Sequence, residues 1–251
     1  MAVLRSRALR SGGIRNTKVE LQMKLNRNTE VESLHVSPPD AKPMLPAVPS
    51  SVVYNEDCVK GLKRFPDKHF DLAIVDPPYG IGGFTQSETK KYGNYKWNEK
   101  PPTEDYFIEL KRVSKERIVW GANYYNCFEG GNAAIIWNKQ NPHPSLSVCE
   151  IASVSWGKKV AYYEYQWHGL AMHRIRSGFH PCEKPVALYE WILKNYTKGG
   201  ELILDTHLGS GSSRIAAYKN GFNFVGFELD PEYYKKQEKR FKDFVSQLRL
   251  F

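Results

Sequence analysis

The segment FDLAIVDPPYG, residues 70–80, joins an apolar run to residues that suit catalysis on an aromatic amine. Such an amine is a poor nucleophile, because its nitrogen lone pair is delocalised into the ring. The Asp76 carboxylate and the Pro77 carbonyl are acceptors that can draw the amine toward tetrahedral geometry. Consecutive prolines, Pro77 and Pro78, restrict the backbone and hold these acceptors in place. Tyr79 can stack on the ring that carries the amine.

A second group of residues has the features of a ligand site. Asp205 precedes Gly209 and Gly211, and glycines let the backbone approach a ligand closely. Glu228 lies 17 residues beyond Gly211, near the spacing at which an acid reaches a ribose diol. Asp57 follows an expected strand and can accept a hydrogen bond from an adenine amino group. The group therefore favours a ligand made of adenosine and an amino acid.

Both groups also have simpler interpretations. A Pro-Pro pair forms rigid turns in many loops, and two glycines can serve only a tight turn between a strand and a helix. A dinucleotide is a further option for the glycine loop. However, the third glycine of the dinucleotide pattern G-x-G-x-x-G is missing, because position 214 is arginine.

The elements around these groups decide whether the groups meet. Apolar runs predict strands at residues 51–54, 70–75, 117–121, 133–137, 201–204 and 223–227, and the aromatic-rich alternation in 148–167 predicts a pair of β-strands. Helices are predicted at 56–64, 103–113, 186–196, 213–220 and 231–247. This alternation indicates an α/β fold with a mostly parallel, twisted sheet covered by helices on both faces. Ligands bind beyond the carboxyl ends of the strands in such sheets, where both groups fall.

The first 50 residues differ from the rest of the chain. They are basic before the first acid, Glu20, and end in a proline-rich stretch. We expect residues 1–50 to be a disordered tail and 51–251 to form a single domain. An arm that contacts DNA and an organelle transit peptide are the alternatives for the tail.

The composition narrows the class of protein. The formal net charge of +9 suits a polyanionic partner such as nucleic acid. No run approaches the length of apolar residues needed for a membrane-spanning helix, and no secretory signal is visible. The four cysteines have no zinc-ligand spacing, so we expect reduced thiols and no metal site.

With these segments placed, the sequence resembles the amino-group DNA methyltransferases. The matching blocks are YNEDCVKGL (54–62), FDLAIVDPPYG (70–80), HPCEKPVALYEWIL (180–193) and LILDTHLGSGSSRIAAYKNGFNFVGFELDPEYY (202–234). The DPPY tetrad precedes the glycine loop, which is similar to the circularly permuted β class. The resemblance implies a Rossmann-like S-adenosylmethionine-dependent methyltransferase fold with permuted motif order. It extends to small phage and mobile-element methylases and to restriction–modification enzymes, and so implies a cytoplasmic protein.

The resemblance also implies roles for individual residues. The catalytic tetrad would be Asp76, Pro77, Pro78 and Tyr79. S-adenosylmethionine would be held by Asp57, Cys58, Lys184, Asp205, Thr206, His207, Gly209, Gly211, Ser212, Glu228 and Leu229. Lys184 is expected to pair with the methionine carboxylate, its alternative being a surface lysine before a helix. Thr206 and His207 replace the Pro-Phe usual in the family, which leaves the role of His207 open.

The implied domain divides into a catalytic half (51–138), a short target-recognition region (about 139–178) and a cofactor half (179–251). Two groups of side chains are expected to contact double-stranded DNA. Basic and aromatic residues interleave in Lys90, Lys91, Tyr95, Lys96 and Trp97, and a polar cluster contains His173, Arg174 and Arg176. A solvated loop is the alternative for the first group.

The residues and the resemblance together predict a site-specific DNA methyltransferase. It would transfer a methyl group from S-adenosylmethionine to the N6 amine of an adenine flipped out of the duplex, and would act as a monomer or a homodimer. Cytosine-N4 methylation is an alternative, although those enzymes usually carry serine where Asp76 stands. An RNA methyltransferase, a non-enzymatic nucleic-acid-binding module and a dinucleotide dehydrogenase are the others. The DNA sequence that is read does not follow from these residues.

Overall fold

The computed structural model describes residues 48–82, 97–141, 147–167 and 177–248. The chain divides into two compact units, residues 1–45 and 46–251, and every described residue lies in the second. All but the last three residues of the expected tail therefore lie outside the described residues.

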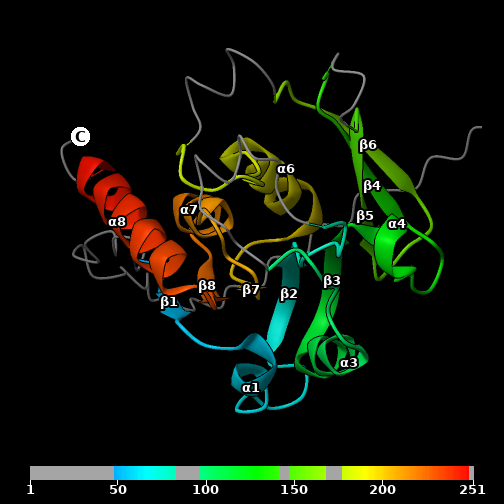
Figure 1. The fold of residues 1–251 in the computed structure, drawn as a ribbon, viewed down its shortest axis with the longest axis horizontal. Helices are drawn as coiled ribbons and strands as arrows, with labels where there is room; N and C mark the ends of the chain where they lie inside the picture. Colours follow the sequence, from blue (N-terminus) through cyan, green and yellow to red (C-terminus); the bar gives the residue numbers. More distant parts are fainter. Residues whose placement is uncertain (1–47, 83–96, 142–146, 168–176, 249–251) are drawn as a thin grey trace, which may run out of the picture. The chain divides into compact units, whose positions relative to one another are not determined.

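In the described part of the chain, eight strands form one sheet, with helices on either side of it (Figure 1). The strands are β1 (Ser51–Tyr54), β2 (Phe70–Val75), β3 (Ser114–Trp120), β4 (Ala134–Asn138), β5 (Cys149–Val154), β6 (Val160–Glu164), β7 (Leu202–Asp205) and β8 (Asn223–Phe227). The helices are α1 (Cys58–Leu62), α3 (Glu104–Val113), α4 (Ala122–Tyr125), α6 (Val186–Tyr196), α7 (Ser212–Lys219) and α8 (Pro231–Leu248).

The sheet order is β1-β8-β7-β2-β3-β5-β4-β6. Strands β1, β8, β7, β2 and β3 are all parallel, as are β4 and β6, whereas β5 runs antiparallel to both of its neighbours. The predicted mostly parallel α/β fold is therefore confirmed. Its consequence for the site is that the carboxyl ends of β8, β7 and β2 lie next to one another at one edge.

The prediction that residues 148–167 form a β pair is wrong in its pairing. Both strands exist, but β4 lies between them: Ile135 of β4 pairs with Ala152 of β5 on one side and Ala161 of β6 on the other. The burial of the strands gives the reason. Strand β4 is mostly buried and takes the interior place, whereas β6 alternates between exposed and half-buried residues, as suits an edge strand.

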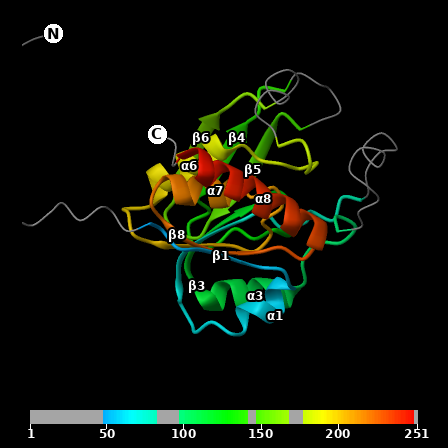
Figure 2. The same ribbon diagram turned by 90° about the vertical axis from the view of Figure 1, so that its left-hand side faces the viewer.

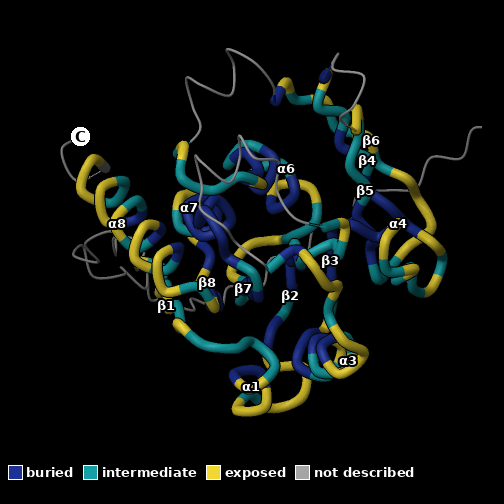
Figure 3. The backbone as a smooth tube through the Cα atoms, in the orientation of Figure 1, coloured by how far each residue is buried: buried dark blue, intermediate teal, exposed yellow. Residues whose placement is uncertain are grey.

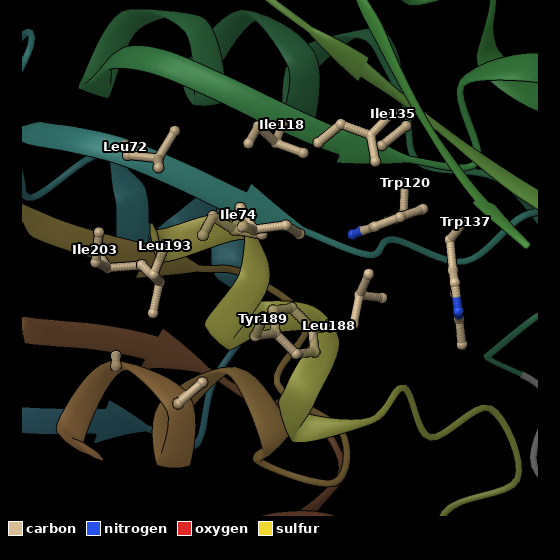
Figure 4. Close-up of a cluster of buried hydrophobic side chains, with 14 of the residues drawn as sticks. Leu72, Ile74, Ile118, Trp120, Ile135, Trp137, Leu188, Tyr189, Leu193 and Ile203 are labelled. Carbon is tan, nitrogen blue, oxygen red and sulfur yellow. The ribbon is translucent and has the colours of Figure 1, made fainter. Parts of the chain in front are cut away.

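Alternate residues of the central strand β2 enter two hydrophobic clusters on opposite faces of the sheet. Leu72 and Ile74 pack with residues of β3, β4, α6 and α7, including Trp120 (Figure 4). Ala73 and Val75 pack with residues of α1 and α3. The two sets of helices lie on opposite sides of the sheet in the turned view (Figure 2). This two-residue alternation of a strand buried on both faces explains why the run FDLAIV is apolar apart from Asp71, its one half-buried residue.

Two short helices at the carboxyl edge depart from expectation. Helix α1 is shorter than the predicted 56–64, because Asp57 has an extended backbone and its Oδ1 accepts a hydrogen bond from the Lys60 amide at 2.9 Å, which makes it the N-cap. Helix α4 was not predicted. It is a single turn between Gly121 and Asn126, which both have left-handed backbones, with φ of 77° and 51°. No described helix combines the length and apolar composition that crossing a bilayer requires.

Gly61 in α1 tests the close packing of this helix against the sheet. A Cβ at this position would lie 2.2 Å from Cε1 of the buried Phe227 ring. Gly61→Ala should therefore destabilise the protein by about 1–3 kcal/mol from overpacking, more than the gain of about 1 kcal/mol in helix propensity. Urea unfolding measures the difference.

The matched background is Phe227→Leu, which removes the ring atoms that the new methyl group would meet. Gly61→Ala should cost less in that background than in the wild type. Equal costs in both backgrounds would show that the Phe227 ring is not the obstacle.

Candidate active site

The structure brings the predicted acids to one edge of the sheet. Asp76 follows β2, Asp205 ends β7 and Glu228 follows β8, and these three strands are neighbours in the sheet. The charge of Asp76 contributes to raising the pKa of Asp205, and the charge of Asp205 contributes in the same way to Glu228. The tetrad and the glycine loop thus form one continuous electrostatic site.

Asp76 lies in a partly buried cluster of charged and polar groups. Its Oδ2 is 2.5 Å from Lys184 Nζ, and its Oδ1 accepts a hydrogen bond from the Tyr79 hydroxyl at 2.8 Å. Lys184 Nζ is also 3.0 Å from Glu150 Oε2 and donates to the Tyr79 hydroxyl at 3.1 Å. Glu150 in turn accepts a hydrogen bond from Lys139 Nζ at 3.0 Å. The cluster joins β2, β5, the end of β4 and the segment before α6.

Burial and charge act against each other in this cluster. Burial raises the pKa of Asp76, and the Lys184 ammonium only partly offsets that effect. Burial also acts to raise the pKa of Glu150, but Lys184 and Lys139 outweigh it and lower that pKa to about 2. Despite the burial of Lys184, the two carboxylates raise its pKa well above the ordinary value. The cluster therefore favours the charged form of Lys184, and of its two acids Asp76 is the one whose pKa is raised.

Glu183 fixes the segment that carries Lys184. The Glu183 side chain is fully buried. Its carboxylate accepts hydrogen bonds from the Ser177 amide at 3.0 and 3.1 Å and pairs with Arg240 of α8 at 3.2 Å. The Glu183 carbonyl accepts a hydrogen bond from the indole of Trp167 at 2.7 Å. Lys184 itself is 5% exposed, which excludes the alternative of a surface lysine. Its contacts place it with Asp76.

Helix α4 holds the rest of the tetrad. The Tyr125 hydroxyl lies 2.6 Å from the Pro77 carbonyl and 2.7 Å from the Pro78 carbonyl. The Tyr79 ring stacks on Tyr124, with ring centroids 4.8 Å apart. A Cβ at Gly121 would lie 2.4 Å from the Tyr79 ring, so only glycine admits this approach.

The sequence interpretation missed α4, although the run GANYY follows β3 at the same edge of the sheet as the tetrad. That position was the available signal. It also missed Asn98, whose Oδ1 accepts a hydrogen bond from the Tyr79 amide at 2.9 Å.

Two of the three acids of the expected cofactor group, Asp205 and Glu228, brace the glycine loop. Asp205 accepts hydrogen bonds from the His207 amide at 3.0 Å and the Ser213 hydroxyl at 2.5 Å. Glu228 accepts a hydrogen bond from the Gly209 amide at 2.7 Å. Burial raises the pKa of Asp205 to about 6 and that of Glu228 to about 7, with the amide and hydroxyl donors acting in the opposite direction. Two such acids favour a ligand that brings hydrogen-bond donors or positive charge.

Thr206 and His207, which stand where the resembled family usually has Pro-Phe, form part of a polar chain beside the glycine loop. The Tyr106 hydroxyl is 2.6 Å from Thr206 Oγ1, which is 2.9 Å from His207 Nδ1. His207 Nε2 is 3.9 Å from Cys58 Sγ. Burial lowers the pKa of His207 to about 4 and raises that of Cys58 to about 12, so the imidazole and the thiol are both neutral. Thr206 and His207 therefore tie the loop to α1 and α3, and Tyr106 was the partner that the sequence interpretation lacked.

Arg214 explains why the glycine loop lacks a third glycine. It is 4% exposed, donates hydrogen bonds to Ser51 Oγ at 2.8 Å and Gln237 Oε1 at 2.9 Å, and pairs with Glu238. Its guanidinium also lies 3.8 Å from the centroid of the Phe241 ring. Arg214 thus joins α7 to β1 and α8, and the buried polar start of α7 (Figure 3) is satisfied by side chains.

The other predicted site residues have varied places. Asp57 caps α1, Leu229 is exposed, and Ser212 is buried with its hydroxyl 3.1 Å from both Ser210 Oγ and Arg240 Nη1. Trp97 stacks on His180, which in turn lies against Gly209. Contact of Trp97 with DNA stays a prediction. The remaining expected DNA contacts, Lys90, Lys91, Tyr95, Lys96, His173, Arg174 and Arg176, lie outside the described residues.

Comparison with known proteins supports the resemblance. Residues 150–239 match the family model for N6 and N4 methyltransferases, described as DNA methylase. The chain is 26% identical over 237 residues to the type II methyltransferase M2.DpnII of Streptococcus pneumoniae, covering 75% of this chain and 88% of that protein. It is 22% identical over 245 residues to M2.MboI of Moraxella bovis, covering 78% and 89%.

Solved structures confirm the predicted fold. The complex of M1.HpyAVI with SAM aligns with a TM-score of 0.51 and 19% identity, over 75% of this chain and 98% of that chain. PvuII DNA methyltransferase, described as cytosine-N4-specific, aligns with a TM-score of 0.50 and 17% identity, over 80% and 94%. The family match begins at Glu150, so the tetrad lies before it.

The raised pKa of Glu228 predicts a pH dependence of stability. The pKa is about 7 in the folded protein against an ordinary 4.5. The unfolded chain therefore loses the Glu228 proton at a lower pH than the folded protein does. The free energy of unfolding falls as the pH rises from 4.5 to about 7. Between about pH 5.5 and about pH 7.5, the wild type should lose about 1–2 kcal/mol more than Glu228→Gln. Urea unfolding at both pH values checks this, and parallel losses in the two proteins would contradict it.

Proposed function

We propose that this chain is a DNA methyltransferase that uses S-adenosylmethionine and acts on the N6 amine of adenine. The observation that carries the proposal is the placement of Asp76 and the Pro77 carbonyl beside the Asp205–Gly211 loop, at the carboxyl edge of a parallel sheet. The match to the DNA methylase family and the type II methyltransferases among its relatives support it.

The acceptors of the tetrad suit an amine that must become nucleophilic. A carboxylate offers about four lone-pair sites, and in Asp76 one oxygen faces Lys184 while the other faces Tyr79, which leaves acceptor capacity for an amine. The Pro77 carbonyl is a second acceptor, and a carbonyl has two lone pairs, so it can serve Tyr125 and an amine together. Acceptors held in fixed positions favour the pyramidal amine, because their orientation requires no rearrangement during reaction.

The residues of the glycine loop fit the proposed cofactor by their chemistry. Glu228 and Asp205 are buried acids with raised pKa values, and they suit ribose hydroxyls and a positively charged ligand. Gly209 and Gly211 have left-handed backbones, with φ of 53° and 78°, at the turn. When bound, S-adenosylmethionine supplies a methyl group on a sulfonium. Lys184 already pairs with two carboxylates, those of Asp76 and Glu150. We therefore assign Lys184 a role in supporting the tetrad and no longer expect it to pair with the methionine carboxylate of the cofactor.

Cytosine-N4 methylation is the second candidate, because a protein described as cytosine-N4-specific shares the fold. The carboxylate at position 76 favours adenine, because cytosine-N4 enzymes usually carry serine at this position. Incubation with methyl-labelled S-adenosylmethionine and unmethylated DNA, followed by nucleoside analysis, distinguishes the two. Label in N6-methyl-2′-deoxyadenosine supports the proposal, label in N4-methyl-2′-deoxycytidine supports the alternative, and absence of label in DNA rejects both.

Substitution of Asp76 tests its role as the acceptor. Asp76→Ala and Asp76→Asn should lower the rate of methyl transfer by at least about a hundredfold, because the charged acceptor is lost. Affinities for DNA and S-adenosylmethionine should stay within about threefold of the wild type, since neither partner is expected to depend mainly on this carboxylate.

The matched control is Asp71→Asn, which changes the same residue type at the other end of β2, where Asp71 pairs with Lys115. Wild-type labelling by an Asp76 variant would reject the assignment of this residue. Loss of DNA affinity together with activity would instead favour a module that only binds nucleic acid.

We expect the Tyr125 hydroxyl to help orient the carbonyl groups of Pro77 and Pro78. Tyr125→Phe removes the hydroxyl shared by Pro77 and Pro78, so the rate of methyl transfer should fall by roughly tenfold with little change in cofactor affinity. Single-turnover labelling measures the rate. Tyr196→Phe, at the end of α6, is the control for loss of a tyrosine hydroxyl. An unchanged rate in Tyr125→Phe would show that the prolines alone hold the carbonyls.

A further inference from the structure

Glu150 is a partly buried acid at the centre of the site, and the sequence interpretation gave it no role. It lies in β5, opposite Trp137 of β4, in a strand whose alternation suggested packing alone. Its Oε2 is 3.0 Å from Lys184 Nζ and 3.3 Å from the Tyr79 hydroxyl, and its Oε1 is 3.0 Å from Lys139 Nζ. It therefore contacts both Lys184 and Tyr79, the two described side chains that bind the Asp76 carboxylate.

The geometry around Lys184 is complete. An ammonium has three donors, and three acceptors surround this one: Asp76 Oδ2 at 2.5 Å, Glu150 Oε2 at 3.0 Å and the Tyr79 hydroxyl at 3.1 Å. Since the Tyr79 oxygen accepts from Lys184, its own proton goes to the nearer carboxylate, Asp76 at 2.8 Å. Glu150 thus fixes the rotation of the ammonium and, through it, the direction of the tyrosine hydroxyl.

The charges of the cluster also balance. Asp76 and Glu150 are matched by Lys184 and Lys139, so the buried site has no net charge while all four groups are ionised. A charge that is shielded from water and has no partner is strongly destabilising, which explains why the fold supplies two cations. Without Glu150, the full charge of Lys184 would act on Asp76 alone.

We propose that Glu150 is a positioning residue for the tetrad, which shares the Lys184 ammonium with Asp76 and so keeps the Asp76 carboxylate available to a target amine. The inference rests on the proposed function. Glu150 does not touch the reacting atoms. It acts through Lys184 and Tyr79, and its loss would let Lys184 pair with Asp76 alone and withdraw electron density from the acceptor.

The pKa of Asp76 is a measure of how Asp76 and Glu150 share the Lys184 ammonium. Among the described residues, the titratable groups that influence or contact this cluster are Tyr79, Tyr124, Tyr125, Lys139, Glu150, Lys184, Tyr189 and Asp205. Of these, Glu150 acts to raise the pKa of Asp76 and Lys184 acts to lower it. Removing the charge of Glu150 should therefore lower the pKa of Asp76, because a neighbouring anion is lost and Lys184 pairs more closely.

The test is Glu150→Gln, which keeps the shape of the side chain and removes its charge. Carbon-13 NMR of protein labelled at the aspartate carboxyl carbon gives the pKa of Asp76, with Asp76→Asn assigning its signal. This readout needs no activity. The matched control is Glu129→Gln, because Glu129 also lies between two cations, Arg117 at 2.6 Å and Lys111 at 3.9 Å, outside the tetrad. We expect a lower pKa of Asp76 in Glu150→Gln and no shift in the control.

Activity supplies the second readout. Single-turnover methyl transfer should fall by roughly tenfold in Glu150→Gln, with the acid limb of its pH profile moved to lower pH and cofactor affinity within about twofold. Glu150→Asp, which restores the charge, should recover part of the rate and move the acid limb back toward the wild-type position. It also serves as the test variant if Glu150→Gln does not fold, since its shorter side chain should weaken the contact with Lys184.

Two results would overturn the inference: an Asp76 pKa in Glu150→Gln equal to that of the wild type, or a wild-type rate and pH profile in that variant. Failure of the proposed function would look different. The wild type would then transfer no methyl group to DNA, whereas the NMR measurement would still decide whether Glu150 controls Asp76.

Discussion

The site depends on one buried cation that two acids share. The Lys184 ammonium lies within 3.0 Å of both Asp76, which follows β2, and Glu150 of β5, while Lys184 itself precedes α6. None of these side chains could be buried at acceptable cost without the others, because an isolated ion loses its hydration. The same contacts that make the fold tolerate the charges also orient the acceptor for an amine. Stability and chemistry are therefore coupled in this cluster.

The parallel sheet is what allows such distant residues to meet. Asp76 and Lys184 are 108 residues apart in sequence, yet the carboxyl end of β2 and the segment before α6 bring them into contact. The order β8-β7-β2 then sets the glycine loop directly beside the tetrad. Because adjacency comes from the sheet and not from chain order, a permuted motif order can build the same site. This constraint explains how the fold is shared with proteins of 17–19% identity.

Much of the fold was predictable, because local patterns determine it. The bounds predicted for 51–54, 70–75, 186–196 and 223–227 match β1, β2, α6 and β8. The order of the strands was harder to predict from the sequence. A two-residue alternation identifies β5 and β6 as strands, but only the greater burial of β4 places that strand between them. The roles of Glu150 and Tyr125 were missed for a similar reason. An acid in an alternating strand resembles a solvent-facing residue, and its partner Lys184 lies 34 positions away.

Glu183 has a further consequence for how this protein can diversify. Trp167 and Ser177 both bind this one residue, so the two ends of the intervening stretch, residues 168–176, are fastened at a common point. Arg240 secures that point to α8. Mutation, insertion or exchange within the stretch can then proceed with Lys184 still anchored by its neighbour. Changes at these nine positions therefore need not disturb the contacts of Glu183, which come from residues outside them.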